Sequence, residues 1–96
     1  MILSFGDKRT AALYHGVANK ELRRLPPDVS RRALSKLDML NAAHDLLDLR
    51  SPPGNRLETL QGELAGMFSI RVNDQWRIVF KWQAGNACEV RLTDYH

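Results

Sequence analysis

The last three residues of the sequence combine groups that could take part in proton transfer. Asp94, Tyr95 and His96 follow one another. Histidine exchanges protons near neutral pH, and a tyrosine, with an ordinary pKa of about 10, can ionise where arginines stabilise its phenolate. Cleavage of RNA by its own 2′-hydroxyl needs a group that removes the hydroxyl proton and a proton for the leaving oxygen. Without such arginines Tyr95 would stack on a base. The alternative for all three residues is an exposed, solvated tail.

The same reaction needs cations that stabilise the charge developing on the phosphate. Guanidinium groups suit this role because their geometry matches that of a phosphate. The basic residues that we expect on the same sheet face as Tyr95 are Arg71, Arg77, Lys81 and Arg91. No metal or other cofactor is required, and nothing near the single cysteine resembles a metal-ligand spacing.

Residues 67–82 predict the β-hairpin that would position two of these arginines. Apolar residues alternate with polar ones on both sides of Asn73-Asp74-Gln75, as in half-buried strands. If these three residues form the loop, the apolar side chains of both strands share one face; a two-residue loop would separate them. This register places Arg71 directly opposite Arg77. Like charges in that position are destabilising, which indicates either a bound phosphate or two solvated arginines.

The N-terminal half predicts the helices that cover the apolar face of this hairpin. Residues 2–5 are typical of a short first strand, and Asp7 can cap a helix that ends near Gly16. The clearest helix begins at Pro27. Its apolar residues recur every three or four positions to about Leu49, which predicts about 22 residues and a length of about 33 Å.

The C-terminal half completes an antiparallel sheet. Residues 56–61 predict a strand, and a turn near Gly85 leads into a last strand whose core-facing residues would be Cys88, Val90 and Leu92. We therefore expect one domain, residues 1–96, of the α+β class. An N-terminal strand and helices would pack on one face of a small, mainly antiparallel sheet of about four strands, and the other face would be open.

Composition is that of a soluble globular domain. The chain is 44% hydrophobic and 26% charged, with a net charge of +3, which permits an acidic partner without requiring one. No run approaches the roughly 18 apolar residues of a membrane helix, and no signal peptide is visible. A cytoplasmic protein without membrane association is expected.

A second group of basic residues precedes and enters the predicted long helix. A solvated helical face is the favoured interpretation over a docking surface. The group consists of Lys20, Arg23, Arg24, Arg31, Arg32 and Lys36.

Three stretches resemble the HigB-type toxins, or plasmid-maintenance killer proteins, of the RelE/ParE superfamily. They are PPGNRLE at 52–58, SIRVNDQWRI at 69–78 and the terminal DYH. The resemblance covers nearly the whole chain. It implies a RelE-like fold and metal-independent endoribonuclease activity on mRNA at the ribosome. It also implies a HigA-like helix-turn-helix antitoxin as partner, with operator DNA bound only through that antitoxin.

The resemblance also suggests roles for individual residues. Arg77 matches a family arginine in the strand after the tryptophan, and the terminal acid, tyrosine and histidine match as well. The candidate catalytic residues are thus Arg77, Asp94, Tyr95 and His96. Asp94 would orient its neighbours, Tyr95 would stack or help remove the 2′-hydroxyl proton, and His96 would transfer protons. The candidate RNA- or phosphate-binding residues are Arg56, Arg71, Lys81 and Arg91.

One segment departs from the family pattern. Where several relatives have Leu-Lys-Gly-Asp-Arg, this chain has Leu-Gln-Gly-Glu-Leu at 60–64. The lysine of those relatives is thus replaced by Gln61, and their arginine by Leu64. A neutral amide can hydrogen-bond a phosphate but cannot neutralise it, so catalysis would be weaker or would depend more on Arg56 and Lys81.

Three functions therefore remain under consideration. The terminal tripeptide favours a ribosome-dependent mRNA endonuclease. The loss of the lysine at Gln61 favours a noncatalytic ParE-like toxin that poisons DNA gyrase. The third is a regulatory module that binds only an antitoxin and DNA. A terminal set of proton-transfer groups has a purpose only in the first, which we favour.

Overall fold

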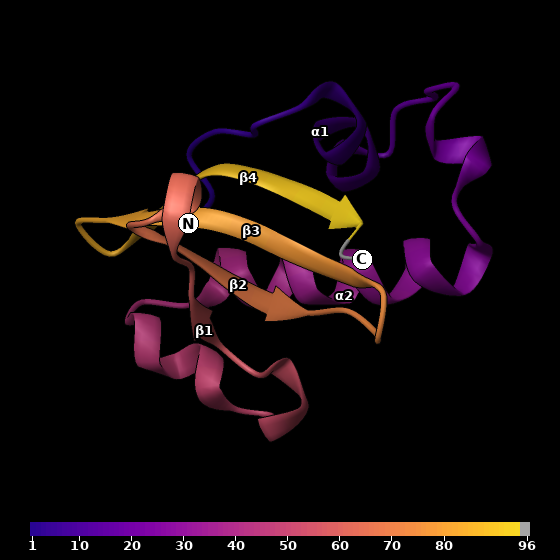
Figure 1. Cartoon of the computed structure of the whole chain (residues 1–96). Coiled ribbons are helices and arrows are strands. Elements are labelled where there is room, and N and C mark those ends of the chain that lie inside the picture. Colours follow the sequence, from indigo (N-terminus) through magenta and orange to yellow (C-terminus); the bar gives the residue numbers. More distant parts are fainter. Residues whose placement is uncertain (95–96) are drawn as a thin grey trace.

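The computed structural model describes residues 1–94. Two α-helices precede four β-strands along the chain (Figure 1). The α-helices are α1, Lys8–His15, and α2, Pro27–Ala42. The strands are β1, Glu58–Thr59, β2, Met67–Arg71, β3, Trp76–Gln83, and β4, Asn86–Asp94. Short 3-10 helices span Leu22–Arg24, Leu46–Arg50, Pro53–Asn55 and Gly62–Leu64.

The four strands form one antiparallel sheet in the order β1-β2-β3-β4, and α2 lies across one face of it (Figure 1). The α+β architecture is as predicted. The expected first strand is reduced to two isolated parallel bridges, Ile2 with Ala87 and Phe5 with Val90. The N-terminal segment thus runs along the outer edge of β4.

The core lies between α2 and the sheet face turned toward it. Val29, Ala33, Leu37 and Leu40 recur at helical spacing and are all buried. They pack in one cluster with buried side chains of the three longer strands, and each large aliphatic side chain so buried stabilises the fold by about 1.5–3 kcal/mol. The cluster's sheet residues include Ile70, Ile78, Phe80, Ala87, Val90 and Leu92.

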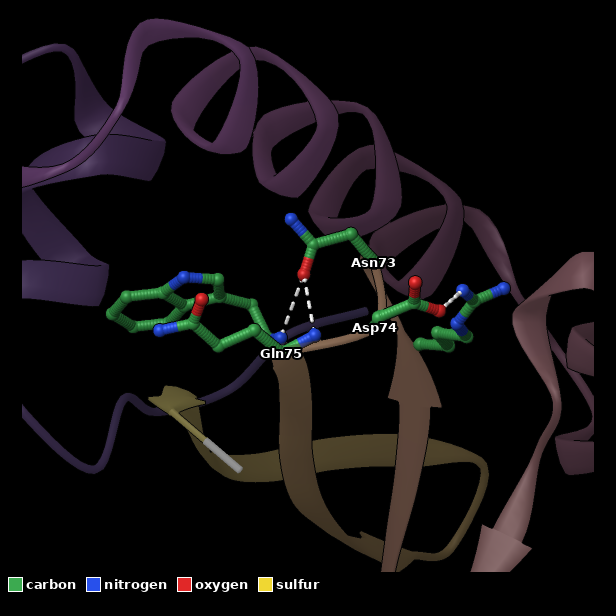
Figure 2. A network of polar contacts seen from close by, with 5 residues as sticks. Asn73, Asp74 and Gln75 are labelled. Carbon is green, nitrogen blue, oxygen red and sulfur yellow. Dashed lines mark hydrogen bonds and ion pairs between the residues drawn. The ribbon is translucent and has the colours of Figure 1, made fainter. Parts of the chain in front are cut away.

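The hairpin of β2 and β3 has the predicted register. Ile70 is the partner of Ile78, and Arg71 is the partner of Arg77. The side-chain oxygen of Asn73 accepts hydrogen bonds from the backbone N–H groups of residues 75 and 76, at 2.9 and 2.8 Å (Figure 2). An asparagine that caps its own turn in this way fixes the loop, which explains why the register follows from this sequence.

The prediction that the long helix continues to Leu49 is wrong. The helix ends at Ala42, and Ala43 is extended, with ψ of 133°. A reciprocal capping box follows, at the start of a 3-10 helix. The side chain of Asp45 accepts a hydrogen bond from the backbone N–H of Asp48, and the side chain of Asp48 accepts one from the backbone N–H of Asp45. Such a box satisfies the N–H groups at the start of a helix, so a separate helix begins here. The apolar spacing continues across the break, which is why the sequence predicted one helix.

The expected orientation of Cys88 is also wrong. Between two paired positions, Val79 with Arg91 and Lys81 with Cys88, β4 has one residue more than β3. Glu89 lies in this bulge with φ of 51°. The extra residue reverses the alternation on its N-terminal side, so Ala87 enters the core with no exposed surface. Cys88 is half-buried on the other face.

Within residues 1–94, no helix combines the length and the hydrophobicity that crossing a membrane requires.

Candidate functional site

The second sheet face, which is turned away from α2, carries four of the eight predicted site residues: Arg71, Arg77, Lys81 and Arg91. It was expected to be open, but its centre is not, since Ser69 and Val79 have no exposed surface. Residues 62–66 lie on this side of the sheet (Figure 1), and three of them, Glu63, Leu64 and Ala65, line a hollow at one end of the face. From the strand register, the residues on the second sheet face include Met67, Ser69, Arg71, Arg77, Val79, Lys81, Cys88, Arg91 and Thr93.

Arg77 lies on the second sheet face as predicted, but it is buried rather than exposed, at 9% relative exposure. Its Nε donates to Ser69 Oγ at 2.8 Å, and its Nη2 donates to the carbonyl oxygen of Arg56 at 2.7 Å. A carboxylate oxygen of Glu58 lies 3.9 Å from Nη2. These contacts fix the plane of the guanidinium, which gives a site a preorganised cation.

Arg56 provides one of these acceptors through its backbone. It follows the short helix Pro53–Asn55 and has φ of 44°, a left-handed conformation uncommon for residues other than glycine. Its carbonyl oxygen receives the bond from Arg77, and its side chain is exposed. The structure therefore brings Arg56 beside Arg77, with the backbone making the contact.

The repulsion expected between Arg71 and Arg77 is offset by carboxylates of the protein itself. Arg71 forms an ion pair with Asp74 in the hairpin loop (Figure 2), while Glu58 lies near Arg77. The side chain of Asp74 is 97% exposed, and exposed ion pairs contribute about 0–1 kcal/mol. Arg71 can therefore exchange this partner for another anion at little cost.

Lys81 and Arg91 meet in a cavity of about 310 Å³, which we call the Glu89 hollow. Glu63 and Glu89 line the same cavity, and Lys81 Nζ lies 2.6 Å from Glu89 Oε2. The hydrogen bond and charge of Lys81 lower the pKa of the Glu89 carboxyl below its usual value. Two cations thus face two carboxylates, so this end of the face is close to electrically neutral.

The departures at positions 61 and 64 also lie at this end. Gln61 is exposed just before the short helix Gly62–Leu64. Leu64 lines the Glu89 hollow. An arginine at position 64 would have added a third cation to this cavity, and leucine instead gives it an apolar wall.

Asp94 lies on the side of the sheet opposite to the one expected. Its β3 partner is Trp76, and directly opposed residues project to the same face, which here is the face toward α2. Its Oδ2 accepts a hydrogen bond from Gln75 Nε2 at 3.2 Å. The neighbouring Thr93 is the partner of Arg77, so the end of β4 does reach the predicted site. Tyr95 and His96 lie outside the described residues.

Sequence reasoning missed a buried polar network beside this site. Asn55 has no exposed surface, and its Nδ2 donates to the carbonyl oxygens of Leu49 and Ser51 at 3.1 and 3.4 Å. Its Oδ1 accepts from Lys36 Nζ at 2.5 Å. Residues 51–55, Ser-Pro-Pro-Gly-Asn, are typical of a turn, and turn residues are usually exposed, so the burial of Asn55 does not follow from the sequence.

Lys36 was expected on the solvated face of its helix, yet it is only half-exposed. Burial lowers the pKa of its ammonium group, and the neighbouring charge of Arg32 lowers it further.

For metal ions, the described residues 1–94 contain no group of three histidine, cysteine or carboxylate side chains arranged to hold one.

Comparison with known proteins identifies the family. A family model described as the RelE-like toxin of the type II toxin-antitoxin system HigB matches residues 3–96. The chain belongs to the HigB-like toxin family. Toxin HigB-1 of Vibrio cholerae is 42% identical over 92 residues, which are 96% of this chain and 95% of that one. The resemblance noted in the sequence is thus confirmed.

Solved structures support the RelE-like fold of this HigB-like toxin at much lower identity. The YoeB–YefM complex from Staphylococcus aureus matches with a TM-score of 0.63 and 14% identity, covering 100% of this chain and 98% of the other. YafQ from Escherichia coli matches with a TM-score of 0.57 and 13% identity, covering 98% and 93%. At such identities the likeness concerns the fold alone.

Proposed function

We propose that this HigB-like toxin is a metal-independent endoribonuclease that cleaves mRNA on the ribosome and so inhibits translation. The observation that carries the proposal is the position of Arg77. Its guanidinium is fixed by Ser69 and Arg56 and lies on the strand position paired with Thr93. A preorganised cation next to the end of β4 is what a phosphate requires if the terminal tripeptide supplies the proton chemistry.

In the proposed reaction the 2′-oxygen forms a bond to phosphorus while the bond from phosphorus to the 5′-oxygen breaks. The 2′-hydroxyl proton passes to a base, for which Tyr95 is our candidate, and the 5′-oxygen receives a proton from His96. Arg77 and Arg71 stabilise the added negative charge on the phosphate. Asp94 acts from the edge of the site, where it is bonded to Gln75, and orients the residues that follow it.

The structure changes how we weigh the other RNA-binding candidates. Arg71 remains a phosphate ligand, because its partner Asp74 is exposed and exchangeable. Arg56 has an exposed side chain that is free to reach an RNA strand near Arg77. Lys81 and Arg91 share the Glu89 hollow with two carboxylates. We therefore expect them to contribute less to phosphate binding than the sequence predicted.

The proposed partner is an antitoxin of the HigA-like, helix-turn-helix kind. Family membership supports a toxin-antitoxin pair, and the solved YoeB–YefM structure is a complex. Contact with operator DNA would occur only through this antitoxin. We propose that the chain acts in the cytoplasm, where it meets ribosomes.

The test is cleavage of mRNA on translating ribosomes, with the new 5′ ends mapped. The full-length chain is expected to cut ribosome-bound message and to leave naked RNA intact at physiological salt, since the ribosome supplies positioning. Deletion of Tyr95 and His96 should abolish cutting without unfolding the domain. Efficient cutting of naked RNA would contradict ribosome dependence, and full activity of the truncated chain would remove the catalytic assignment.

A second candidate, a ParE-like gyrase poison, is favoured by two observations. These are the glutamine at position 61 and the neutral Glu89 hollow. Such a toxin would inhibit supercoiling by purified gyrase whether or not Tyr95 and His96 are present. The nuclease predicts no effect on gyrase, so this assay separates the two.

A further inference from the structure

A second hollow lies between α2 and the end of β2, and no function has been assigned to it. Its volume is about 300 Å³. We call it the Lys36 hollow, and its lining residues are Arg32, Ser35, Lys36, Gly54, Arg71 and Val72.

We propose that the Lys36 hollow binds a phosphate group of an RNA backbone. The inference rests on the proposed function, because it names where a further part of the RNA chain is held. Among the described residues 1–94, the lining includes three cationic side chains and no carboxylate. Asp74, outside the lining, neutralises only Arg71. The contrast with the Glu89 hollow, where cations and carboxylates are equal in number, indicates which of the two selects an anion.

One cation of this hollow, Lys36, is held in place from within the fold. Lys36 Nζ donates to Asn55 Oδ1 at 2.5 Å, and Asn55 is itself fixed by two backbone carbonyls. Since Asn55 is fully buried, the ammonium group cannot move away from the hollow without leaving a buried acceptor unpaired. Burial and the charge of Arg32 both disfavour the protonated lysine, and a bound anion would counter both effects.

The donors in the hollow suit a phosphate better than a carboxylate. Two guanidinium groups, an ammonium and the hydroxyl of Ser35 line it. Guanidinium forks bind the oxygens of either anion in pairs, so the preference depends on how many acceptor oxygens the anion offers. A phosphodiester offers charged oxygens and ester oxygens in a tetrahedral arrangement, whereas a carboxylate offers two oxygens in a plane.

Arg71 connects this hollow to the candidate active site. It lines the Lys36 hollow and is also the strand partner of Arg77. An RNA strand that places one phosphate at Arg77 can therefore place another in the hollow once Arg71 exchanges its exposed partner Asp74 for that phosphate. The interpretation of the helix as a merely solvated basic face thus changes for Arg32 and Lys36.

The experiment measures binding of a short 2′-O-methyl RNA, which has no free 2′-hydroxyl and so cannot be cut by the proposed reaction. Arg32→Gln is compared with Arg31→Gln, a matched control that removes the same charge from the neighbouring exposed position outside the hollow. Arg32→Gln should raise Kd about fivefold at low salt and reduce the slope of log Kd against log salt by about one. Arg31→Gln should change Kd by less than about twofold.

Equal effects of the two substitutions, or no measurable binding by the wild-type chain at low salt, would overturn the proposal. So would a polyglutamate peptide that competes as well as the RNA and loses affinity equally in Arg32→Gln, since the hollow would then recognise an acidic polypeptide. Lys36→Gln, checked for folding by thermal denaturation, should weaken RNA binding at least as much as Arg32→Gln.

Failure of the hollow and failure of the proposed function give different results. If the wild-type chain fails to cut mRNA on ribosomes while Arg32→Gln still weakens RNA binding, the nuclease assignment fails and the hollow stands. If the wild-type chain cuts mRNA on ribosomes and Arg32→Gln and Arg31→Gln bind RNA equally well, only the proposal for the Lys36 hollow fails.

Discussion

Arg77 Nη2 lies 2.7 Å from the carbonyl oxygen of Arg56 and joins the middle of the sheet to the loop that precedes β1. The carbonyl is available because residue 56 is left-handed after a turn of 3-10 helix. The cation proposed to bind the substrate phosphate is thus also a structural tie between two distant segments. Its removal therefore affects folding as well as chemistry.

The first prediction concerns the stability of Arg77→Ala. The substitution leaves Ser69 Oγ and the Arg56 carbonyl without this donor and should reduce the free energy of unfolding by about 2 kcal/mol or more. Denaturant unfolding measures the change, and Arg31→Ala, at an exposed helical position, should stay within about 0.5 kcal/mol. An Arg77→Ala protein as stable as wild type would show that these contacts do not form in solution.

The second prediction concerns Asn55. Asn55→Ala removes a fully buried side chain with three polar partners and should cost about 2–3 kcal/mol. Asn55→Asp keeps an acceptor for Lys36 but cannot donate to the two carbonyls, so it should also be destabilising. Asn86→Ala, which loses one exposed bond, is the control. If it costs as much as Asn55→Ala, the network has no special role.

The third prediction concerns the turn between β3 and β4. Ala84 and Gly85 both have positive φ, 50° and 79°, as type I′ hairpin turns require. Alanine is strained there, so Ala84→Asn should stabilise the protein by about 0.5–1 kcal/mol and raise Tm by several degrees. Gly85→Ala should lower Tm, because its Cβ would be strained and would lie 3.4 Å from the His44 carbonyl oxygen. The expected result is a rise in Tm for Ala84→Asn and a fall in Tm for Gly85→Ala, and changes in the same direction would contradict the assigned turn.

The fourth prediction concerns pH. Hydrogen bonds from the backbone N–H groups of Asp45 and His44 lower the pKa of the Asp48 carboxyl. A lowered pKa means that the charged form stabilises the fold. This contribution is fully present above the ordinary value of about 3.9 and is lost as pH falls through the lower folded value.

Asp48→Ala should therefore be less stable than wild type at pH 7, and the difference in unfolding free energy should shrink as pH falls below about 4. Asp38→Ala, at an exposed position of α2, controls for the general effect of losing a carboxylate. A difference that does not change with pH would contradict the assigned hydrogen bonds.

The hairpin register was predictable because the alternation on both sides of residues 73–75 is compatible with one loop length. The end of α2 was not. Leu46, Leu47 and Leu49 continue the apolar spacing, and only the competing box of Asp45 and Asp48 interrupts it. Periodicity reports which residues are apolar, whereas local capping decides where a helix ends.

Neither the bulge in β4 nor the burial of Arg77 could be predicted from the sequence, for a similar reason. Alternation along β4 cannot reveal an unpaired residue, so Cys88 was placed on the wrong face. Arg77 was expected to be exposed because the second sheet face was predicted to be open. The acceptors that allow its burial, Ser69 Oγ and the carbonyl of Arg56, come from residues whose closeness is set only by the tertiary structure.

The bridges between the N-terminal segment and β4 bear on how the chain is made. Leu3 and Gly6 donate backbone hydrogen bonds to Ala87 and Val90, partners that are synthesised more than eighty positions later. Contacts so distant in sequence close late in folding. A toxin that we propose to act on ribosomes thus cannot complete its sheet on the ribosome that makes it until β4 has emerged.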